Sequence, residues 1–82
     1  MTLSDSVILD FLYEKDLELP PKALYRNLNR HGQEIGYSTV QLRLNELLEH
    51  DFVTRDGDGY YEITNKGKMW VEGKLSESDF GG

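Results

Sequence analysis

Cysteine is absent from this 82-residue chain, and proline and histidine occur only twice each. Without cysteine the chain has no disulfide, no cysteine-ligated zinc site and no iron–sulfur cluster. Long apolar runs are lacking as well, because the longest of them, such as residues 7–9, hold only three residues. This excludes a membrane span and the apolar core of a signal peptide. The length fits one small domain, which we expect in the cytoplasm.

Catalytic and metal-binding patterns are equally scarce. The two histidines, His31 and His50, lie far apart in the sequence, and neither belongs to a recognisable Ser-His-Asp set. Residues 56–59, Asp-Gly-Asp-Gly, lack the third acidic position and the downstream glutamate of a calcium loop. No glycine-rich loop is placed to hold a phosphate. We therefore expect a protein without catalysis, cofactor or metal.

Charge is distributed unevenly along the chain. Fifteen acidic residues against nine Lys and Arg give a net charge of −6, which argues against a generic nucleic-acid binder. The balance is −4 over residues 1–18, +3 over residues 19–45 and −5 over residues 46–82. A basic middle between acidic ends indicates a local function for the positive charge.

Hydrophobic spacing predicts three helices in the first fifty residues. The first spans residues 5–15, with Ser4 as its N-cap. Pro21 opens the second, which ends at His31, just before Gly32. The third spans residues 39–49 and is capped by Ser38.

A hairpin and a short closing helix are predicted to follow. Residues 52–55 and 60–64 are prone to form strands, and the Asp-Gly-Asp-Gly stretch between them favours a tight turn. Alternation places Tyr61 and Ile63 on one face of the second strand. Thr64 or Asn65 then caps the last helix.

This order of elements resembles the winged helix-turn-helix family. Tyr37-Ser-Thr-Val-Gln-Leu-Arg-Leu-Asn, with the residues up to Arg55, resembles the recognition helix and the first wing strand. Tyr61-Glu-Ile-Thr-Asn-Lys-Gly resembles the second wing strand and the cap of the closing helix. The acidic balance, Pro-Pro-Lys-Ala-Leu-Tyr and Gly-Tyr-Ser-Thr-Val are most similar to phage-repressor-like regulators of halophilic archaea.

The resemblance implies a mainly helical α+β domain, which we place over residues 1–75. Residues 76–82 lack periodicity and are predicted to form a disordered tail. It also implies sequence-specific binding of double-stranded DNA in transcriptional control, often as a homodimer. The chain departs from the family at Leu42, where a basic residue is common, and at the acidic hairpin turn. Its connector before the third helix is also longer than that of the minimal motif.

The third helix, about residues 38–50, is the predicted recognition helix. A helix fits the major groove, and side chains near its N-terminus meet base edges. Arg pairs with guanine, and Gln or Asn with adenine, so its outward residues are equipped to read bases. The predicted base-reading residues are Ser38, Thr39, Gln41, Arg43 and Asn45. In the alternative interpretation they form only the solvated face of an amphipathic helix.

The second helix carries a cation at every fourth position, which gives one ridge along its surface. These residues are predicted to contact DNA phosphates, together with one cation at the base of the hairpin and one hydroxyl before the third helix. The predicted phosphate contacts are Lys22, Arg26, Arg30, Arg55 and Tyr37. A solvated charged face is the alternative for the ridge, and a ring packed on the core is the alternative for Tyr37.

Apolar residues on expected surfaces leave further alternatives open. Leu42 faces outward and either touches a thymine methyl, belongs to a protein contact or lies half-buried under the wing. Trp70, Val71 and Leu75, with Phe80, form either a dimer surface or the closure of the core. A second function, a winged-helix module that binds a protein of the transcription machinery, is the competing hypothesis.

The acidic total has an interpretation of its own. In molar salt, long-range attraction is screened within about 3 Å, so DNA binding would depend on short-range hydrogen bonds and fit. Acidic surfaces elsewhere would keep the protein hydrated. The hypothesis is therefore binding that persists at high salt.

Overall fold

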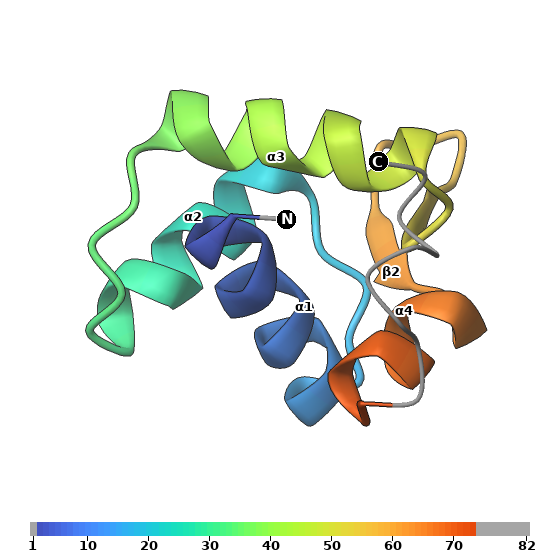
Figure 1. Ribbon diagram of the computed structural model, residues 1–82. Coiled ribbons are helices and arrows are strands. Elements are labelled where there is room, and N and C mark those ends of the chain that lie inside the picture. Colours follow the sequence, from blue (N-terminus) through green and yellow to red (C-terminus); the bar gives the residue numbers. More distant parts are fainter. Residues whose placement is uncertain (1, 74–82) are drawn as a thin grey trace.

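A computed structural model describes residues 2–73 of the chain (Figure 1). Its elements follow in the order α1 (Leu3–Lys15), α2 (Pro21–Arg30), α3 (Tyr37–Glu49), β1 (Val53–Arg55), β2 (Tyr61–Ile63) and α4 (Asn65–Val71). The predicted fold class, α+β and mainly helical with a hairpin before the last helix, is confirmed. Within the described residues no helix is long and apolar enough to cross a membrane. The predicted tail, residues 76–82, lies outside the described residues.

The core lies between the first three helices and the inner face of the hairpin. In Figure 1, α3 crosses above α1 and α2, while α4 lies against α1 at the other end. Each helix contributes one stripe of side chains, and the hairpin contributes the buried side of β2. The fully buried apolar residues of α1, α2 and α3 are Ile8, Leu9, Leu12, Leu24, Leu28, Val40, Leu44 and Leu47.

Helix α1 begins earlier than the hydrophobic spacing predicts. Thr2, and not Ser4, is the N-cap: its hydroxyl accepts a hydrogen bond from the Asp5 amide at 3.2 Å. The Asp5 carboxylate accepts one from the Thr2 amide at 3.0 Å, which completes a capping box. The prediction of Ser4 was wrong because it overlooked this reciprocal three-residue spacing.

Helix α3 also begins earlier, at Tyr37. Gly36 precedes it in an extended conformation and makes no side-chain cap, so the prediction of Ser38 as the cap was wrong. The Tyr37 ring packs edge-on against Tyr25 of α2, with 5.6 Å between ring centroids. This tertiary contact anchors the first turn in place of a cap. By contrast, Pro21 is the first residue of α2, as predicted.

The hairpin is shorter than predicted but has the expected faces. β1 and β2 are antiparallel with Thr54 opposite Glu62, and residues 52, 60 and 64 lie outside the strands. Tyr61 and Ile63 are buried while Glu62 is exposed, which confirms the predicted alternation. Leu19 pairs with Tyr61 through two backbone hydrogen bonds of 3.0 and 2.8 Å. The segment before α2 therefore covers the outer edge of β2.

Helix α4 closes the fold against the hairpin. The Thr64 hydroxyl caps it by accepting a hydrogen bond from the Gly67 amide at 3.1 Å. Of the two predicted caps, Thr64 and Asn65, Thr64 is therefore confirmed. Trp70 and Val71 are half-buried and pack against the core, so core closure applies to both. Leu75 and Phe80 lie outside the described residues.

One charged contact joins α1 to α3 inside the domain. Asp5 is 2% exposed, and its two carboxylate oxygens accept from Arg43 Nε at 2.7 Å and Arg43 Nη2 at 3.0 Å. Burial by itself raises the pKa of Asp5, but the Arg43 hydrogen bonds, the Thr2 amide and the Arg43 charge together hold it below its ordinary value. The same carboxylate raises the pKa of Arg43. The ionised pair is therefore the stable form.

Replacing Asp5 tests this pair. We expect Asp5→Asn to lower the free energy of unfolding at pH 7 by about 2 kcal/mol, since the hydrogen bonds to a charged acceptor are weakened. Because the folded-state pKa is depressed, the contribution is present above the unfolded pKa near 3.9 and is lost as the pH falls through the folded value. Urea denaturation between pH 2 and 7 should show a flatter acid limb for the variant.

Asp10→Asn is the matched control on the same helix. Partial burial and the Glu14 charge raise the pKa of Asp10, so neutralising it should leave stability at pH 7 unchanged or slightly higher. Equal losses from both variants would contradict a special role for the Asp5–Arg43 pair.

Gly67 provides a steric test of how α4 packs. A Cβ at this position would lie 2.3 Å from the Phe52 carbonyl oxygen and 2.7 Å from Ile63 Cγ1. We expect Gly67→Ala to destabilise the domain by about 2 kcal/mol, which would lower the melting temperature by about 10 °C. Gly57→Ala, where nothing lies within 4 Å, should leave the melting temperature unchanged in the same calorimetric scan.

Candidate nucleic-acid interface

One face of α3 points away from the core and is free of acidic side chains over its first nine residues. Ser38, Leu42 and Asn45 follow each other at helical spacing along the middle of this face, and all three are exposed. Thr39 and Gln41 flank this row and are exposed too. We call these five residues the α3 outer face. The predicted outward placement is therefore confirmed for Ser38, Thr39, Gln41 and Asn45.

Arg43 does not belong to the α3 outer face, which corrects the prediction that it faces outward. Its side chain is 23% exposed, and its guanidinium holds the Asp5 carboxylate of α1. The residue lies beside Leu44 at the margin of the buried stripe, where a long side chain can turn inward. Helical periodicity predicts a solvent-exposed position for Arg43. It cannot show the buried partner Asp5, because that residue lies thirty-eight positions away in the sequence.

Tyr37 combines the two interpretations given to it. Its ring packs edge-on against Tyr25, yet the residue remains 39% exposed. Gln41 Nε2 donates a hydrogen bond to the Tyr37 hydroxyl at 3.3 Å. That hydroxyl keeps its own proton to donate. The pair therefore presents one donor and an oriented amide at the start of α3.

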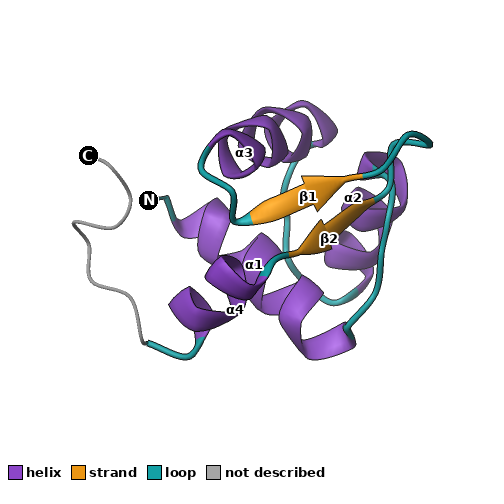
Figure 2. Ribbon diagram, turned by 90° about the vertical axis from the view of Figure 1, so that its right-hand side faces the viewer, coloured by secondary structure: helices purple, strands orange, loops and turns teal. Residues whose placement is uncertain are grey.

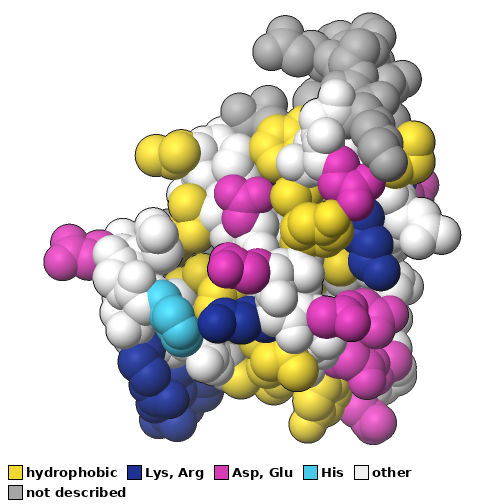
Figure 3. Space-filling model, turned by 90° about the horizontal axis from the view of Figure 1, so that it is seen from below, with side chains coloured by type: hydrophobic (Ala, Val, Ile, Leu, Met, Phe, Trp, Pro, Cys, Tyr) yellow, Lys and Arg dark blue, Asp and Glu magenta, His cyan; other side chains and the backbone are white. Residues whose placement is uncertain are grey.

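The cations of α2 form the predicted ridge. Lys22, Arg26 and Arg30 are exposed on the side opposite buried Leu24 and Leu28. Within residues 2–73 none of the three is in an ion pair. Figure 3 shows the side of the domain away from α3, where Lys and Arg form one projecting group at a corner and otherwise alternate with Asp and Glu. The three α2 cations are thus exposed and have no ion-pair partner among the described residues.

The hairpin lies at the other end of α3. Figure 1 shows α2 beneath the N-terminal half of α3 and the hairpin near its C-terminal end, and Figure 2 shows α2 and the hairpin turn on the same side of α3. Arg55 is exposed at the end of β1. Asp56 accepts hydrogen bonds from the amides of Asp58 and Tyr60, at 2.9 and 3.0 Å, so its carboxylate organises the turn.

Two positioning residues were missed by sequence reasoning. Asp5 orients Arg43, and the only sequence signal was its place in the capping box with Thr2. Asn29 Nδ2 donates to the Tyr25 carbonyl at 2.9 Å and to the Ile35 carbonyl at 3.0 Å. It thereby ties the connector of residues 31–36 to α2.

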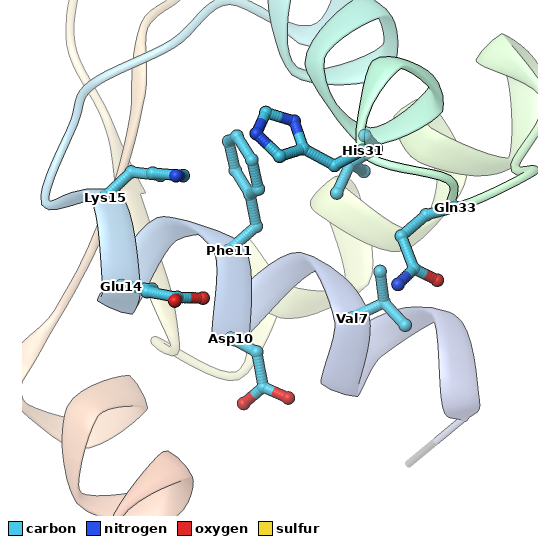
Figure 4. A pocket seen from close by; sticks show the side chains of 8 residues that line it. Val7, Asp10, Phe11, Glu14, Lys15, His31 and Gln33 are labelled. Atoms are coloured by element: carbon cyan, nitrogen blue, oxygen red, sulfur yellow. The ribbon is translucent and has the colours of Figure 1, made fainter.

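A pocket of about 280 Å³ opens between α1 and the end of α2, away from the α3 outer face (Figure 4). The rings of Phe11 and His31 meet there edge-on, with centroids 5.6 Å apart. Asp10 and Glu14 stand at its rim. The lining holds these two carboxylates against the single ammonium of Lys15, so its net negative charge disfavours a phosphate. This pocket does not belong to the candidate nucleic-acid interface.

Comparison with known proteins identifies the family. Residues 6–70 match the ribonuclease R winged-helix domain. No curated protein and no solved structure matches the chain. The match runs from within α1 to within α4 and so includes α2, α3 and both strands of the hairpin. It agrees with the arrangement of helices and hairpin described above. The chain therefore belongs to the ribonuclease R winged-helix domain family.

Proposed function

We propose that this domain binds double-stranded DNA sequence-specifically and regulates transcription, with α3 lying in the major groove. The observation that carries the proposal is the α3 outer face, which has polar side chains and no carboxylate in its N-terminal half. The exposed, unpaired cations of α2, which packs against α3, would supply the positive charge. A winged-helix family is compatible with nucleic-acid binding, and the exposed residues supply the specificity.

Each element has a separate task in this proposal. Ser38, Thr39, Gln41 and Asn45 face the base edges, because the N-terminal half of a recognition helix approaches them most closely. Lys22, Arg26 and Arg30 contact phosphates and set the orientation of the domain. Tyr37 donates its hydroxyl proton to a phosphate, and Arg55 extends the contact at the hairpin. No catalytic step and no cofactor enter this mechanism.

Regulation follows from occupancy. A domain seated in the major groove excludes other proteins from the same bases, which makes repression the simplest outcome. The resemblance to phage-repressor-like regulators of halophilic archaea and the net charge of −6 support binding at high salt. Four cations are proposed to face the DNA, so affinity falls less steeply with salt than it does for a binder with many phosphate contacts.

A second candidate is a module that binds a protein partner. Leu42 is 58% exposed in the middle of the α3 outer face, where it offers an apolar contact to a protein partner. The two functions respond differently to substitution. Leu42→Asp would break an apolar protein contact, whereas Gln41→Ala would leave it intact.

Substitution on the α3 outer face tests the first function. Sites would be selected from a pool of random duplexes, and the affinity for the selected site measured by fluorescence anisotropy. We expect Gln41→Ala and Asn45→Ala each to cost about 1–3 kcal/mol in binding, because each removes paired hydrogen bonds to a base. Glu62→Ala, an exposed hairpin residue outside this face, is the control and should bind normally. Unchanged affinity for both α3 variants, with Leu42→Asp disrupting a protein complex, would favour the second function.

Salt titration tests the phosphate contacts. Four cations are proposed to contact phosphates, namely Lys22, Arg26, Arg30 and Arg55. They predict that log K falls against log salt with a slope no steeper than about −4. Arg26→Ala should flatten the slope by about 1 and weaken binding to all sequences alike. Lys15→Ala, an exposed cation on α1, should leave the slope unchanged. Complete loss of binding in molar salt would contradict the high-salt proposal.

Pairing of two copies through α4 stays a prediction. Met69 of α4 is 41% exposed next to half-buried Trp70 and Val71, which supplies apolar area at this end of the domain. Sedimentation equilibrium should then give a mass that falls toward the monomer for Met69→Glu. A monomeric mass for the natural chain at every concentration would contradict pairing.

A further inference from the structure

We infer that the DNA sites of this domain contain A·T pairs, whose thymine methyl packs against Leu42 and whose adenine is read by Gln41 or Asn45. The inference rests on the proposed function and concerns which bases the α3 outer face prefers. Three features of the structure lead to it: the orientation of Arg43, the exposure of Leu42 and the state of the two amide side chains.

The first feature is that Arg43, the side chain of α3 that would pair with guanine, is bound to Asp5. Arg and Lys make the commonest specific contact with guanine, through its O6 and N7 atoms. Arg43 is the only Arg or Lys within α3, and both its Nε and one terminal nitrogen are held by the Asp5 carboxylate. The α3 outer face is therefore uncharged, and it has no residue of the kind that favours G·C pairs.

The second feature is the place of Leu42. It lies between Ser38 and Asn45 in the middle row of the α3 outer face, and 58% of it is exposed. A helix inserted into the major groove would bring this side chain against base edges. The thymine methyl is the apolar group among the base edges of that groove. An apolar side chain in this position therefore discriminates in favour of thymine.

The third feature is the amide pair beside Leu42. Gln41 is oriented by its hydrogen bond to the Tyr37 hydroxyl at 3.3 Å, so less side-chain freedom is lost when it binds. Asn45 is exposed, and its side chain makes no hydrogen bond within the part of the chain that the structure describes. Both amides match the donor and acceptor of adenine N6 and N7. In this proposal Leu42 contacts the thymine of an A·T pair, and Gln41 or Asn45 contacts its adenine.

Removal of a single methyl group tests this. In the duplex selected from a random pool, each thymine in turn is replaced by deoxyuridine, which keeps the base pairing and lacks the methyl. We expect the natural domain to lose about fourfold in affinity at one or two positions, the effect of exposing one buried carbon. Leu42→Ala should bind the thymine and deoxyuridine duplexes equally. Because Leu42 is exposed, this variant should fold normally, which circular dichroism checks.

The outcomes separate the inference from the proposed function. Tight, sequence-specific binding that ignores every thymine methyl, or a selected site made of G·C pairs, would overturn the A·T preference and leave DNA binding intact. An equal loss with deoxyuridine in the natural domain and in Leu42→Ala would overturn the assignment to Leu42. Failure to enrich any duplex would overturn both.

Discussion

The buried carboxylate of Asp5 must be paired, and its pairing with Arg43 decides which side chains of α3 remain available at the α3 outer face. Asp5 of α1 is buried where it meets Arg43 of α3, and it is stable as an anion because Thr2 and Arg43 supply its hydrogen bonds. The Arg43 contact joins α3 to α1 beside the buried stripe of α3. Because Val40, Leu44 and Leu47 of that stripe face the core, Leu42 and its polar neighbours point outward. Arg43, the residue of α3 best suited to contact DNA, is thus used inside the protein, and the α3 outer face is left uncharged.

Local patterns in the sequence predicted most of the fold. The periodicity of α1 and α2, Pro21 as a helix start, the Thr64 cap and the alternation of β2 all depend on neighbours within a few residues. Two of the failures come from contact between distant segments, whereas the Ser4 cap failed because of the local capping box of Thr2 and Asp5. Arg43 turns inward because of Asp5, and α3 starts at Tyr37 because its ring meets Tyr25. Four of the five predicted base readers lie on the α3 outer face, since helical spacing alone determines their direction.

The net charge of this chain is negative, but the exposed surface of α2 is locally positive. The whole protein is acidic, yet its three α2 cations are exposed and unpaired within the described residues. Asp56 is used to organise the hairpin turn, which gives one acidic residue near the interface a structural role. An acidic protein can therefore keep a small positive surface where a polyanion would lie. Affinity then depends on fit and hydrogen bonding more than on total charge.

The central claim is that the duplex lies along α3 and the cation ridge of α2. Nuclear magnetic resonance tests it most directly, by following the amide signals of the labelled domain as random duplex is added at several salt concentrations. The account predicts that the largest shifts fall on residues 37–45 and on Lys22, Arg26 and Arg30, with the α1–α4 side unchanged. Shifts confined to α1, α4 or the Phe11–His31 pocket, or no shifts at any salt concentration, would contradict it.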